Sequence, residues 1–467
     1  MDMMKKPLAI LLLVLFMAPA SALCAESTEG AREVALMIEA AEPNSVLVLP
    51  AGTYYGNLRI SKPLVIEGSG DVIIQGEGKG TVIEIMCPGV TLRGLTVRGS
   101  GINVTREPAA IRAVAGPVII EDNTIEDALF GIDLRESPGS IVRRNSVRGK
   151  DLAPGRRGDG IRLWWSHNCT IQDNTVVGSR DMVFWYSEGL LIERNNVSDS
   201  RYGLHFMYSH DTVLRENMLE RNSVGVYLMY SNRITLSGNV MRNNRGASGY
   251  GIGLKDCDDI VVDDNALLAN RVGVYVDNSP SSVDATGIFA SNLIGYNEVG
   301  ILATPNTHDA VFTSNALIEN EQQVATHGRG DLTRNNFNRD GVGNFWSDYA
   351  GFDRDRDGIG DVPYEPRSLF GAMLAQEPNL RIFVHSPAQQ AVEFTARALP
   401  ELRPSPTLVD EFPFSVPPEM TGRIAQAGTG SFGMASAGFG MLAVAGGLAF
   451  AAGKQPIGKR KLGGSRR

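Results

Sequence analysis

The heptapeptide Gly203-Leu-His-Phe-Met-Tyr-Ser209 returns 22 residues later as Gly225-Val-Tyr-Leu-Met-Tyr-Ser231. Two related stretches precede it, Gly160-Ile-Arg-Leu-Trp-Trp-Ser166 and Asp181-Met-Val-Phe-Trp-Tyr-Ser187. Within these stretches apolar residues alternate with period 2, which is the period of a strand rather than of a helix. A strand motif that returns about every 22 residues is typical of a solenoid whose coils stack on one another.

An asparagine follows each of these four motifs 14 residues after its start. The full column reads Asn123, Asn145, Asn174, Asn195, Asn217, Asn239, Asn265, Asn292 and Asn315. A stacked asparagine can bond amide groups of the coils above and below it. The pattern therefore predicts an all-β fold, a right-handed parallel β-helix, that is regular over residues 109–343. The alternative, a leucine-rich repeat, needs a helix or extended segment on its outer arc, and the turns here leave no room for one.

The flanking segments differ in composition from the coils. Residues 26–108 are expected to form an N-terminal cap and the first coils, beginning with a short amphipathic helix over residues 31–41. Residues 367–423 are expected to form a helical extension and a Pro-rich linker. Within that extension Ser386-Pro387 is a helix start signal, which predicts a helix over residues 386–399.

An Asp-rich turn, residues 344–366, lies between the coils and the extension. Asp353, Asp355 and Asp357 alternate and are followed by Gly358, as in the first half of a calcium-binding loop. The twelfth position is Tyr364 rather than Glu, so Asp361 is a further candidate ligand, with Glu365 as the alternative. We expect a structural Ca²⁺ that closes the end of the β-helix, with a solvated acidic turn as the alternative.

Both ends of the chain have the character of membrane signals. Residues 1–25 have the charged, apolar and small-residue regions of a secretory signal peptide. Residues 424–453 carry no charge and contain an apolar run long enough to span a bilayer, and a basic tail, residues 454–467, follows. The sequence predicts a protein exported to the periplasm and anchored to the inner membrane by a transmembrane helix, with a flexible Gly/Ala-rich tail as the alternative.

Charge and motifs exclude several classes of function. The chain has a net charge of −8. The first six residues sum to +1 and the tail from Lys454 to +6, so residues 7–453 carry −15. An acidic body argues against a nucleic-acid partner, since phosphate binding needs a basic face. The sequence contains no GxSxG, P-loop or CxxC motif.

Cysteines and insertions add two expectations. Cys169 and Cys257 lie about four coils apart, near 19 Å at about 4.8 Å per coil, which is too far for a disulfide. We therefore expect free thiols. Insertions at residues 149–158 and 244–249 follow the same part of the coil, so they are expected to project from one edge. Such loops often carry contacts.

A soft and aromatic column is the main candidate for chemistry. Trp164, Trp185, Met207 and Met229 share the fifth position of successive coils, and His205 shares the outer face with Met207. His210 closes the same coil. Thioether and imidazole donors suit Cu(I), a soft ion. We therefore predict transient Cu(I) contacts at His205, Met207, His210 and Met229. The alternative is a packing or docking surface without metal.

At these residues the chain resembles the NosD family. The resemblance rests on Ala51-Gly-Thr-Tyr, on the two Met-Tyr-Ser motifs, and on Asn344-Phe-Trp-Ser-Asp-Tyr followed by Asp357-Gly-Ile-Gly-Asp-Val-Pro-Tyr. It covers roughly residues 30–400 and implies a non-catalytic accessory protein for nitrous oxide reductase maturation. Its implied partners are an ABC-type ATPase and membrane-subunit complex, a copper chaperone lipoprotein and the apo nitrous oxide reductase. The apolar segment 424–453 is outside the family pattern.

Two other functions stay open on the sequence. A carbohydrate-active β-helix enzyme would need an acidic cluster with basic groups on one outer face, and the nearest candidate is Arg156-Arg157-Gly158-Asp159. A metal-free docking scaffold would use the exposed aromatic column alone. Glycan turnover would identify the first, and partner binding that survives copper chelation would identify the second.

Overall fold

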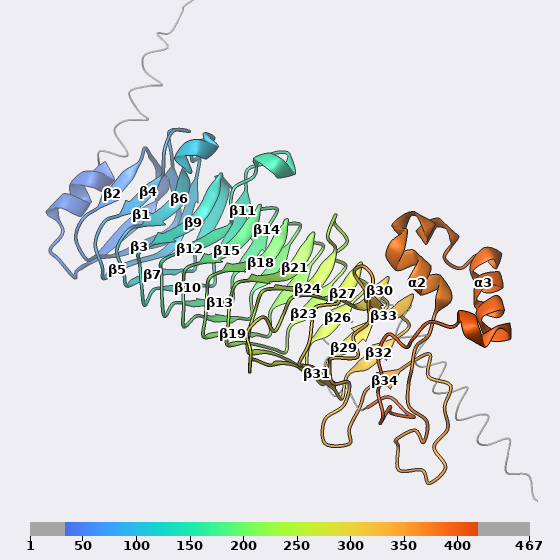
Figure 1. Cartoon of the computed structure of the whole chain (residues 1–467). Coiled ribbons are helices and arrows are strands. Elements are labelled where there is room, and N and C mark those ends of the chain that lie inside the picture. Colours follow the sequence, from blue (N-terminus) through green and yellow to red (C-terminus); the bar gives the residue numbers. More distant parts are fainter. Residues whose placement is uncertain (1–32, 419–467) are drawn as a thin grey trace, which may run out of the picture.

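Short strands of alternating apolar residues, mostly three to a coil, stack along the axis of the structure, which is a computed structural model (Figure 1). The structure describes residues 33–418. The predicted signal peptide, the apolar run 424–453 and the basic tail lie outside the described residues. Every pairing between the strands of the coils is parallel, for example β15 with β18 and β18 with β21. The predicted all-β parallel β-helix is confirmed.

One strand from each coil belongs to a twelve-stranded sheet. Its members are β2 (Leu58–Ile60), β4 (Ile83–Ile85), β6 (Ala109–Ala113), β9 (Phe130–Arg135), β12 (Ile161–Trp164), β15 (Asp181–Trp185), β18 (Tyr202–Met207), β21 (Val224–Met229), β24 (Tyr250–Lys255), β27 (Val272–Asp277), β30 (Val299–Ala303) and β33 (Gln322–Thr326).

The remaining strands form the other sides of the coil. They are β1 (Val46–Tyr55), β3 (Val65–Gln75), β5 (Val90–Arg98), β7 (Val118–Glu121), β8 (Thr124–Ala128), β10 (Ile141–Arg143), β11 (Ser146–Gly149), β13 (Thr170–Gln172), β14 (Thr175–Val177), β16 (Leu191–Glu193), β17 (Asn196–Ser198), β19 (Thr212–Arg215), β20 (Met218–Glu220), β22 (Ile234–Ser237), β23 (Val240–Arg242), β25 (Ile260–Asp263), β26 (Ala266–Leu268), β28 (Gly287–Ala290), β29 (Leu293–Gly295), β31 (Ala310–Thr313), β32 (Ala316–Ile318) and β34 (Phe345–Trp346).

The core is a column of inward side chains. Leu204 and Phe206 of β18 are fully buried, and Phe206 stacks on Phe184 of the previous coil with ring centroids 4.7 Å apart. Because successive strand residues point to opposite faces, His205 and Met207 lie on the outside of the same strand. The parallel register then aligns each outward residue with its equivalent one coil away.

The predicted asparagine column forms a continuous hydrogen-bonded ladder. The backbone N–H and the Nδ2 group of Asn217 both donate to Oδ1 of Asn239, at 3.0 and 2.9 Å. Nδ2 of Asn217 also donates to the carbonyl oxygen of Ile192 at 2.9 Å. The same pattern extends from Asn123 to Asn344. This ladder pairs buried amide groups at the corner, which would otherwise destabilise each coil.

Two further ladders occupy other corners. Serine hydroxyls of one coil accept from backbone N–H groups of the previous coil, as Ser231 does from Ser209 at 3.1 Å. A second asparagine ladder, which the sequence reading missed, runs through Asn222, Asn244, Asn270, Asn297 and Asn320. In the described chain Cys87, Cys169 and Cys257 are free thiols, as expected.

Both ends of the coil are closed. At the N-terminal end a helix over residues 33–40 buries Val34 and Ile38 in the core. At the other end Asp410 is fully buried and accepts from the backbone N–H of Asn344 at 2.8 Å and from Nε1 of Trp346 at 2.9 Å. Burial raises the pKa of Asp410, while these hydrogen bonds oppose the rise.

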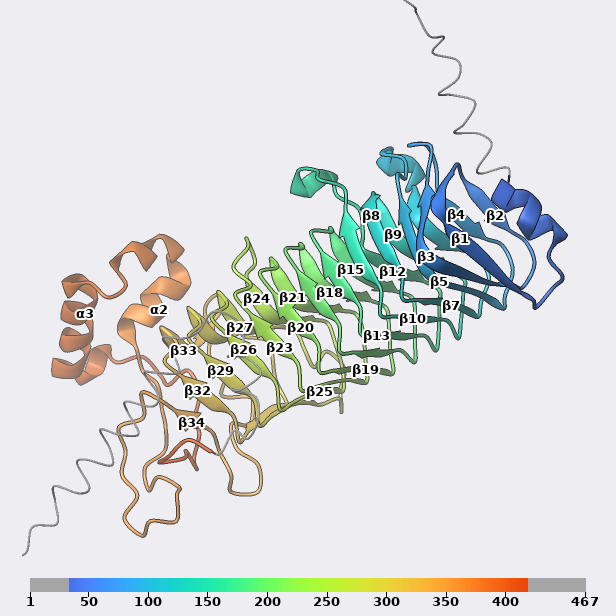
Figure 2. The same ribbon diagram turned by 180° about the vertical axis from the view of Figure 1, so that it is seen from behind.

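The C-terminal extension packs as two short helices beside the last coils, as Figure 2 also shows. They are α2 (Leu369–Gln376) and α3 (Pro387–Ala398), and Ser386 caps α3 by accepting from the N–H of Gln389 at 3.4 Å. The predicted helix start at Ser386 is confirmed. Short 3₁₀ turns are η1 (Val104–Arg106), η2 (Pro154–Arg156), η3 (Pro378–Phe383) and η4 (Pro400–Leu402). Within residues 33–418, none of the helices has the length and apolar character needed to cross a bilayer.

Candidate functional site

A column of large side chains covers the outer face of the twelve-stranded sheet. Trp164 of β12 is in register with Trp185 of β15, Trp185 with Met207 of β18, and Met207 with Met229 of β21. We call these four residues the Met–Trp face. Both methionines are half-buried, so their thioethers are neither in the core nor fully solvated. The predicted alignment of Met207 with Met229 on one outward column is confirmed.

An aromatic ladder lies next to the Met–Trp face, at the corner that ends each of these strands. Its members are Trp165, Tyr186, Tyr208 and Tyr230. Successive rings stack with centroids 4.9, 5.3 and 5.1 Å apart. Each of the four has a φ of 51 or 52°, a left-handed conformation that bulky side chains rarely adopt. Trp165 is 48% exposed and Tyr208 42%, so the ladder presents aromatic surface to solvent.

His205 lies two residues before Met207 on the same strand, below the exposed surface. Its ring is only 5% exposed, and Nδ1 lies 3.3 Å from Oδ2 of Asp181. Its ring also lies edge-to-face with Trp185, with centroids 5.6 Å apart. Among the described residues, Nε2 of His205 and Nε1 of Trp185 are buried without a hydrogen-bond partner. Two polar ring nitrogens are therefore left unsatisfied on the strands β15 and β18, which also carry members of the Met–Trp face.

Asp181 holds His205 in place. Burial pushes the pKa of Asp181 up, but hydrogen bonds from His205 and Arg201 outweigh it and hold that pKa below its ordinary value. The carboxylate is therefore ionised at neutral pH and accepts from Nδ1 of His205. This assigns the ring proton to Nδ1 and leaves the lone pair on Nε2 available as a donor to metal.

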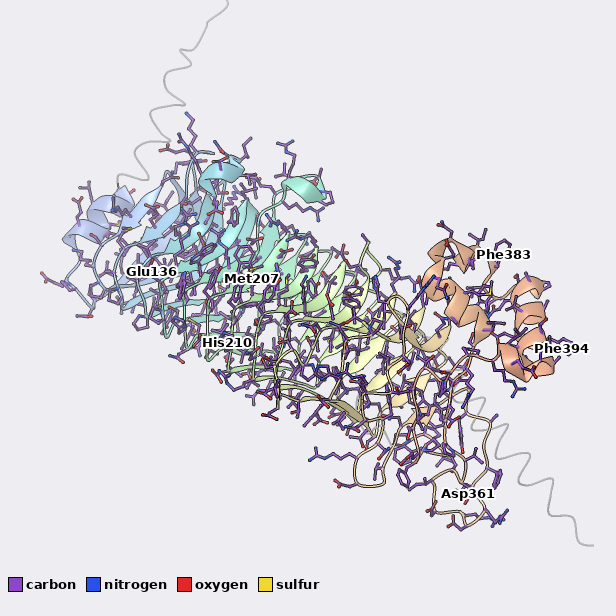
Figure 3. All side chains as sticks on the ribbon, viewed as in Figure 1. Glu136, Met207, His210, Asp361, Phe383 and Phe394 are labelled. Carbon is purple, nitrogen blue, oxygen red and sulfur yellow. The ribbon has the colours of Figure 1, made fainter. Side chains whose placement is uncertain are left out.

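His210 does not belong to this group. The left-handed residue Tyr208 turns the chain after β18, and His210 lies beyond that turn, away from Met207 (Figure 3). Its Nδ1 accepts from the backbone N–H of Asn232 at 3.1 Å, just as His167 does from Glu188 at 3.2 Å. The structure does not bring His210 together with Met207, because a corner that linear spacing does not show lies between them. The ring of His210 instead links two coils.

The structure places a charged network beside the Met–Trp face that the sequence reading missed. Arg162 is buried and donates to Asp133 at 2.9 Å through Nε and to both oxygens of Glu107 at 2.9 Å. Arg162 is in register with Asp133 on one neighbouring coil and with Val183 on the other. Arg162 and Val183 each lie two residues before a member of the Met–Trp face, Trp164 and Trp185. Reading the third position of each coil as a column would have found them.

Asp159 lies at the edge of this network. Burial, together with the nearby charge of Asp181, raises the pKa of Asp159 to about 7. Its Oδ1 has no hydrogen-bond partner in the part of the chain that the structure describes, and Nε of Arg180 is 3.9 Å away. The group is 5% exposed, so a polymeric substrate has little access to it.

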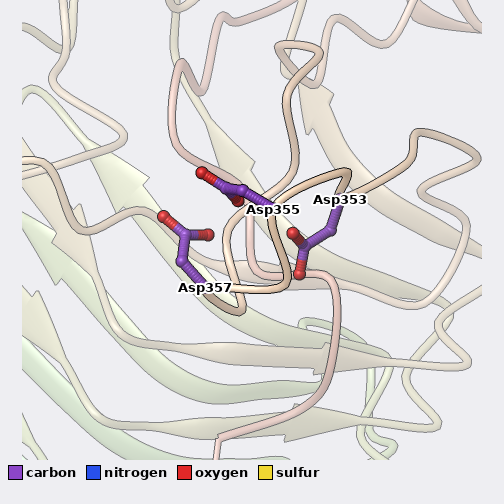
Figure 4. A group of neighbouring side chains, drawn as sticks. All are labelled: Asp353, Asp355 and Asp357. Atoms are coloured by element: carbon purple, nitrogen blue, oxygen red, sulfur yellow. The ribbon is translucent and has the colours of Figure 1, made fainter.

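The Asp-rich turn brings three of its four candidate aspartates together. Carboxylate oxygens of Asp353, Asp355 and Asp357 all lie within 4.8 Å of one another (Figure 4). Asp361 is not part of the group, since its Oδ2 accepts from the N–H of Arg354 at 2.7 Å. Although burial opposes it, hydrogen bonds from Gly358 N–H, the Ser415 hydroxyl and Arg356 N–H lower the pKa of Asp353.

Comparison with known proteins places the chain in a family. A family model described as a periplasmic copper-binding protein, NosD, matches residues 145–351. A protein of Pseudomonas aeruginosa named a probable ABC transporter binding protein NosD is 32% identical over 380 residues, 78% of this chain and 87% of the relative. The chain belongs to the NosD family. A Stutzerimonas stutzeri protein of the same name is 28% identical over 78% of this chain and 85% of its own length.

Solved structures similar to this NosD-family chain include two Azotobacter vinelandii enzymes. The A-module of mannuronan C-5 epimerase AlgE6 has a TM-score of 0.46 and 14% identity, over 66% of this chain and 93% of its own. The A-module of AlgE4 has a TM-score of 0.41 and 15% identity, over 66% and 94%.

The segment that matches the NosD model contains the Met–Trp face, the aromatic ladder and His205. It ends two residues before Asp353 of the Asp-rich turn. The candidate copper donors therefore lie in the part of the chain that carries the family signature, and the acidic cluster lies just beyond it.

Proposed function

We propose that this protein is a non-catalytic accessory factor that holds Cu(I) transiently during assembly of the copper sites of nitrous oxide reductase. One observation supports this proposal most. Met207 and Met229 are in register on adjacent coils, and two residues before Met207 on the same strand face, Nε2 of His205 is buried without a hydrogen-bond partner. The family description as periplasmic copper-binding proteins supports the choice of metal.

The donor set suits a soft ion that must later be released. Two thioethers and one imidazole nitrogen bind Cu(I) without a carboxylate ligand, which would favour harder metals. Asp181 keeps the proton on Nδ1 of His205, so Nε2 stays a donor. The ring of Trp185, edge-on to His205, limits the access of water to the site.

The partners of this function follow from the family. The two relatives are named ABC transporter binding proteins, and we propose that this chain also docks on an ABC-type ATPase and membrane-subunit complex. A lipoprotein copper chaperone would supply Cu(I) and the apo reductase would receive it. The exposed aromatic ladder next to the donors is the surface we assign to one of these protein contacts.

The ends of the chain would place this function at the membrane. We propose that residues 1–25 direct export, that residues 424–453 anchor the protein, and that the tail after Lys454 stays cytoplasmic. Protease treatment of spheroplasts tests the topology. Loss of a tag inserted after Gly30, behind the signal peptide, with retention of a tag after Arg467 is expected, and loss of both tags would contradict the anchor.

A Cu(I) competition titration of the purified full chain tests the donor assignment. Met207→Leu with Met229→Leu keeps the apolar volume but removes both sulfur donors, so Cu(I) affinity should fall by about tenfold or more. The matched control is Met218→Leu with Met373→Leu, which removes two methionines outside the Met–Trp face. Equal affinity of the two double variants would reject the assignment.

A metal-free docking scaffold is the competing function, and the same variants separate the two. If partner capture persists with a Cu(I) chelator present and the wild-type chain shows no affinity for Cu(I), the aromatic ladder alone carries the function. We expect instead that the wild-type chain binds Cu(I), and that Tyr208→Ala weakens partner capture without changing Cu(I) affinity.

A further inference from the structure

A groove lined by arginine lies on the edge of the coils from which both inserted loops project. The loop of residues 149–158, which contains η2, and the loop of residues 244–249 stand on the same side of the helix (Figure 1). Between them the groove has a volume of about 540 Å³. Its arginines are Arg157, Arg180, Arg201, Arg221 and Arg245, and Asp199 is the one acidic residue among the described residues that line it.

The arginines follow the coil repeat. The backbone N–H of Arg201 donates to the carbonyl oxygen of Arg180 at 2.7 Å, so these two residues lie on adjacent coils. Arg245 lies two coils beyond Arg201, where the second inserted loop begins. At about 4.8 Å per coil, Arg180 and Arg245 are separated by roughly 14 Å along the axis. The groove therefore offers a row of cationic groups rather than one point charge.

Three of the five guanidinium groups already have carboxylate partners. Arg201 pairs with Asp181, Arg221 with Asp199 at 3.1 Å, and Arg245 with Glu298 at 2.9 Å. These pairs fix the side chains in orientation. A guanidinium has five N–H donors, so each of these arginines keeps donors that its carboxylate partner does not use.

Arg157 and Arg180 differ from the other three. Arg157 donates only to the carbonyl oxygens of Leu152 and Asp199, at 2.9 and 3.1 Å, so among residues 33–418 no carboxylate pairs with it. Arg180 donates no side-chain hydrogen bond within the described chain, and its nearest carboxylate oxygens, on Asp159 and Asp181, are 3.9 Å away. The guanidinium groups of Arg157 and Arg180 thus line one end of the groove and have N–H donors that no carboxylate of the described chain accepts from.

We propose that this groove binds an extended acidic peptide segment of a partner protein, with Arg157 and Arg180 clamping its carboxylates. Guanidinium forks match carboxylates in a bidentate geometry. An extended segment of about four or five residues spans the row, at about 3.4 Å per residue. The net charge of −15 over residues 7–453 would repel a broad polyanion such as nucleic acid, so a narrow acidic segment fits this island of positive charge.

Fluorescence anisotropy with a labelled hexaglutamate peptide and the purified full chain tests the proposal. Hexaglutamate should bind at low salt and hexaglutamine should not. Arg180→Gln removes a guanidinium that holds no hydrogen bond of the fold, and combining it with Arg157→Gln should weaken hexaglutamate binding about tenfold or more. Arg157→Lys with Arg180→Lys keeps the charge and should give an intermediate loss, because lysine lacks the fork.

The control is Arg59→Gln with Arg339→Gln, which removes the same charge from surfaces away from the groove and should leave binding unchanged. Equal binding by the control and the groove variant, or no binding of hexaglutamate, would overturn the proposal. Competition by millimolar phosphate as strong as that by unlabelled peptide would reassign the groove to small anions. Tighter binding of an oligogalacturonate than of the peptide would reassign it to acidic sugars.

The groove is independent of the copper proposal. Met207→Leu with Met229→Leu should leave hexaglutamate binding unchanged. Arg157→Gln alone should leave Cu(I) affinity unchanged, because the Arg157 side chain bonds only the carbonyl oxygens of Leu152 and Asp199 in the described chain.

Discussion

The asparagine ladder and the Met–Trp face are built on the same coils, but their polar groups are paired to different degrees. In the ladder, backbone and side-chain N–H groups of Asn195 and Asn217 find acceptors on the next coil. Across the described residues four buried side-chain atoms lack a hydrogen-bond partner, and Trp185, His205 and Asp159 hold three of them. The hydrogen bonds of the asparagine corner are thus satisfied within the coil. The outer face keeps polar atoms without protein partners, which a ligand could bond.

The largest effect is expected in the ladder. Asn217→Ala removes the acceptor for the backbone N–H and Nδ2 of Asn195 and the donor to Ile192, which leaves several buried groups unpaired. Unfolding in urea should show a loss of about 3–5 kcal/mol. Met218→Leu, a volume-conserving change in the next residue, should cost less than about 1 kcal/mol. A similar loss in both variants would show that the asparagine ladder does not supply the stability assigned to it here.

The next effect concerns Asp159, whose contribution to the free energy of unfolding is expected to depend on pH. Because burial raises the folded-state pKa of Asp159 to about 7, the stability that its protonated form gives is present below about pH 4. It is lost as pH rises through about 7. Asp159→Asn should therefore be more stable than the wild type at pH 8, by roughly 4 kcal/mol, and this gain should shrink toward pH 4. Asp340→Asn, on an exposed loop, is the control. A gain that is the same at every pH would contradict the account.

A smaller effect is expected at the residue that orients His205. Asp181→Asn weakens the hold on the Nδ1 proton, so Cu(I) affinity in the competition titration should fall about tenfold. The control is Asp199→Asn, which breaks an exposed pair with Arg221 without touching His205 and should leave Cu(I) affinity unchanged. If both variants bind Cu(I) as the wild type does, His205 is not a ligand.

The smallest effect is expected at the Asp-rich turn, where we propose a structural Ca²⁺ on Asp353, Asp355 and Asp357. Alternate carboxylates that converge in this way suit calcium. Millimolar Ca²⁺ should raise Tm by about 2–4 °C over the value in EGTA. Asp355→Asn should abolish the rise and Asp361→Asn should retain it, since Asp361 faces Arg354 instead. A rise in Tm that survives Asp355→Asn would place the ion elsewhere.

The coil was predictable from the sequence because its constraints repeat. Asn217 and Phe206 each have equivalents one coil away, so period and alternation alone assign them to the ladder and the core. The same reasoning aligned Met207 with Met229.

Features that depend on a corner or on several coils together were not predictable in this way. The turn at Tyr208 separates His210 from Met207, and only its left-handed φ shows this. The pairing of Arg162 with Asp133 and Glu107 joins residues up to 55 positions apart. Arg180 became a candidate ligand-binding residue only when the structure showed that no hydrogen bond uses its guanidinium within the described chain.

X-ray absorption of the Cu(I)-loaded full chain tests the central claim most directly. If the Met–Trp face holds the ion, the spectrum should show two sulfur scatterers and one imidazole nitrogen, and Met207→Leu with Met229→Leu should remove the sulfur signal. A spectrum with only nitrogen and oxygen scatterers, or a sulfur signal unchanged in the double variant, would contradict the claim.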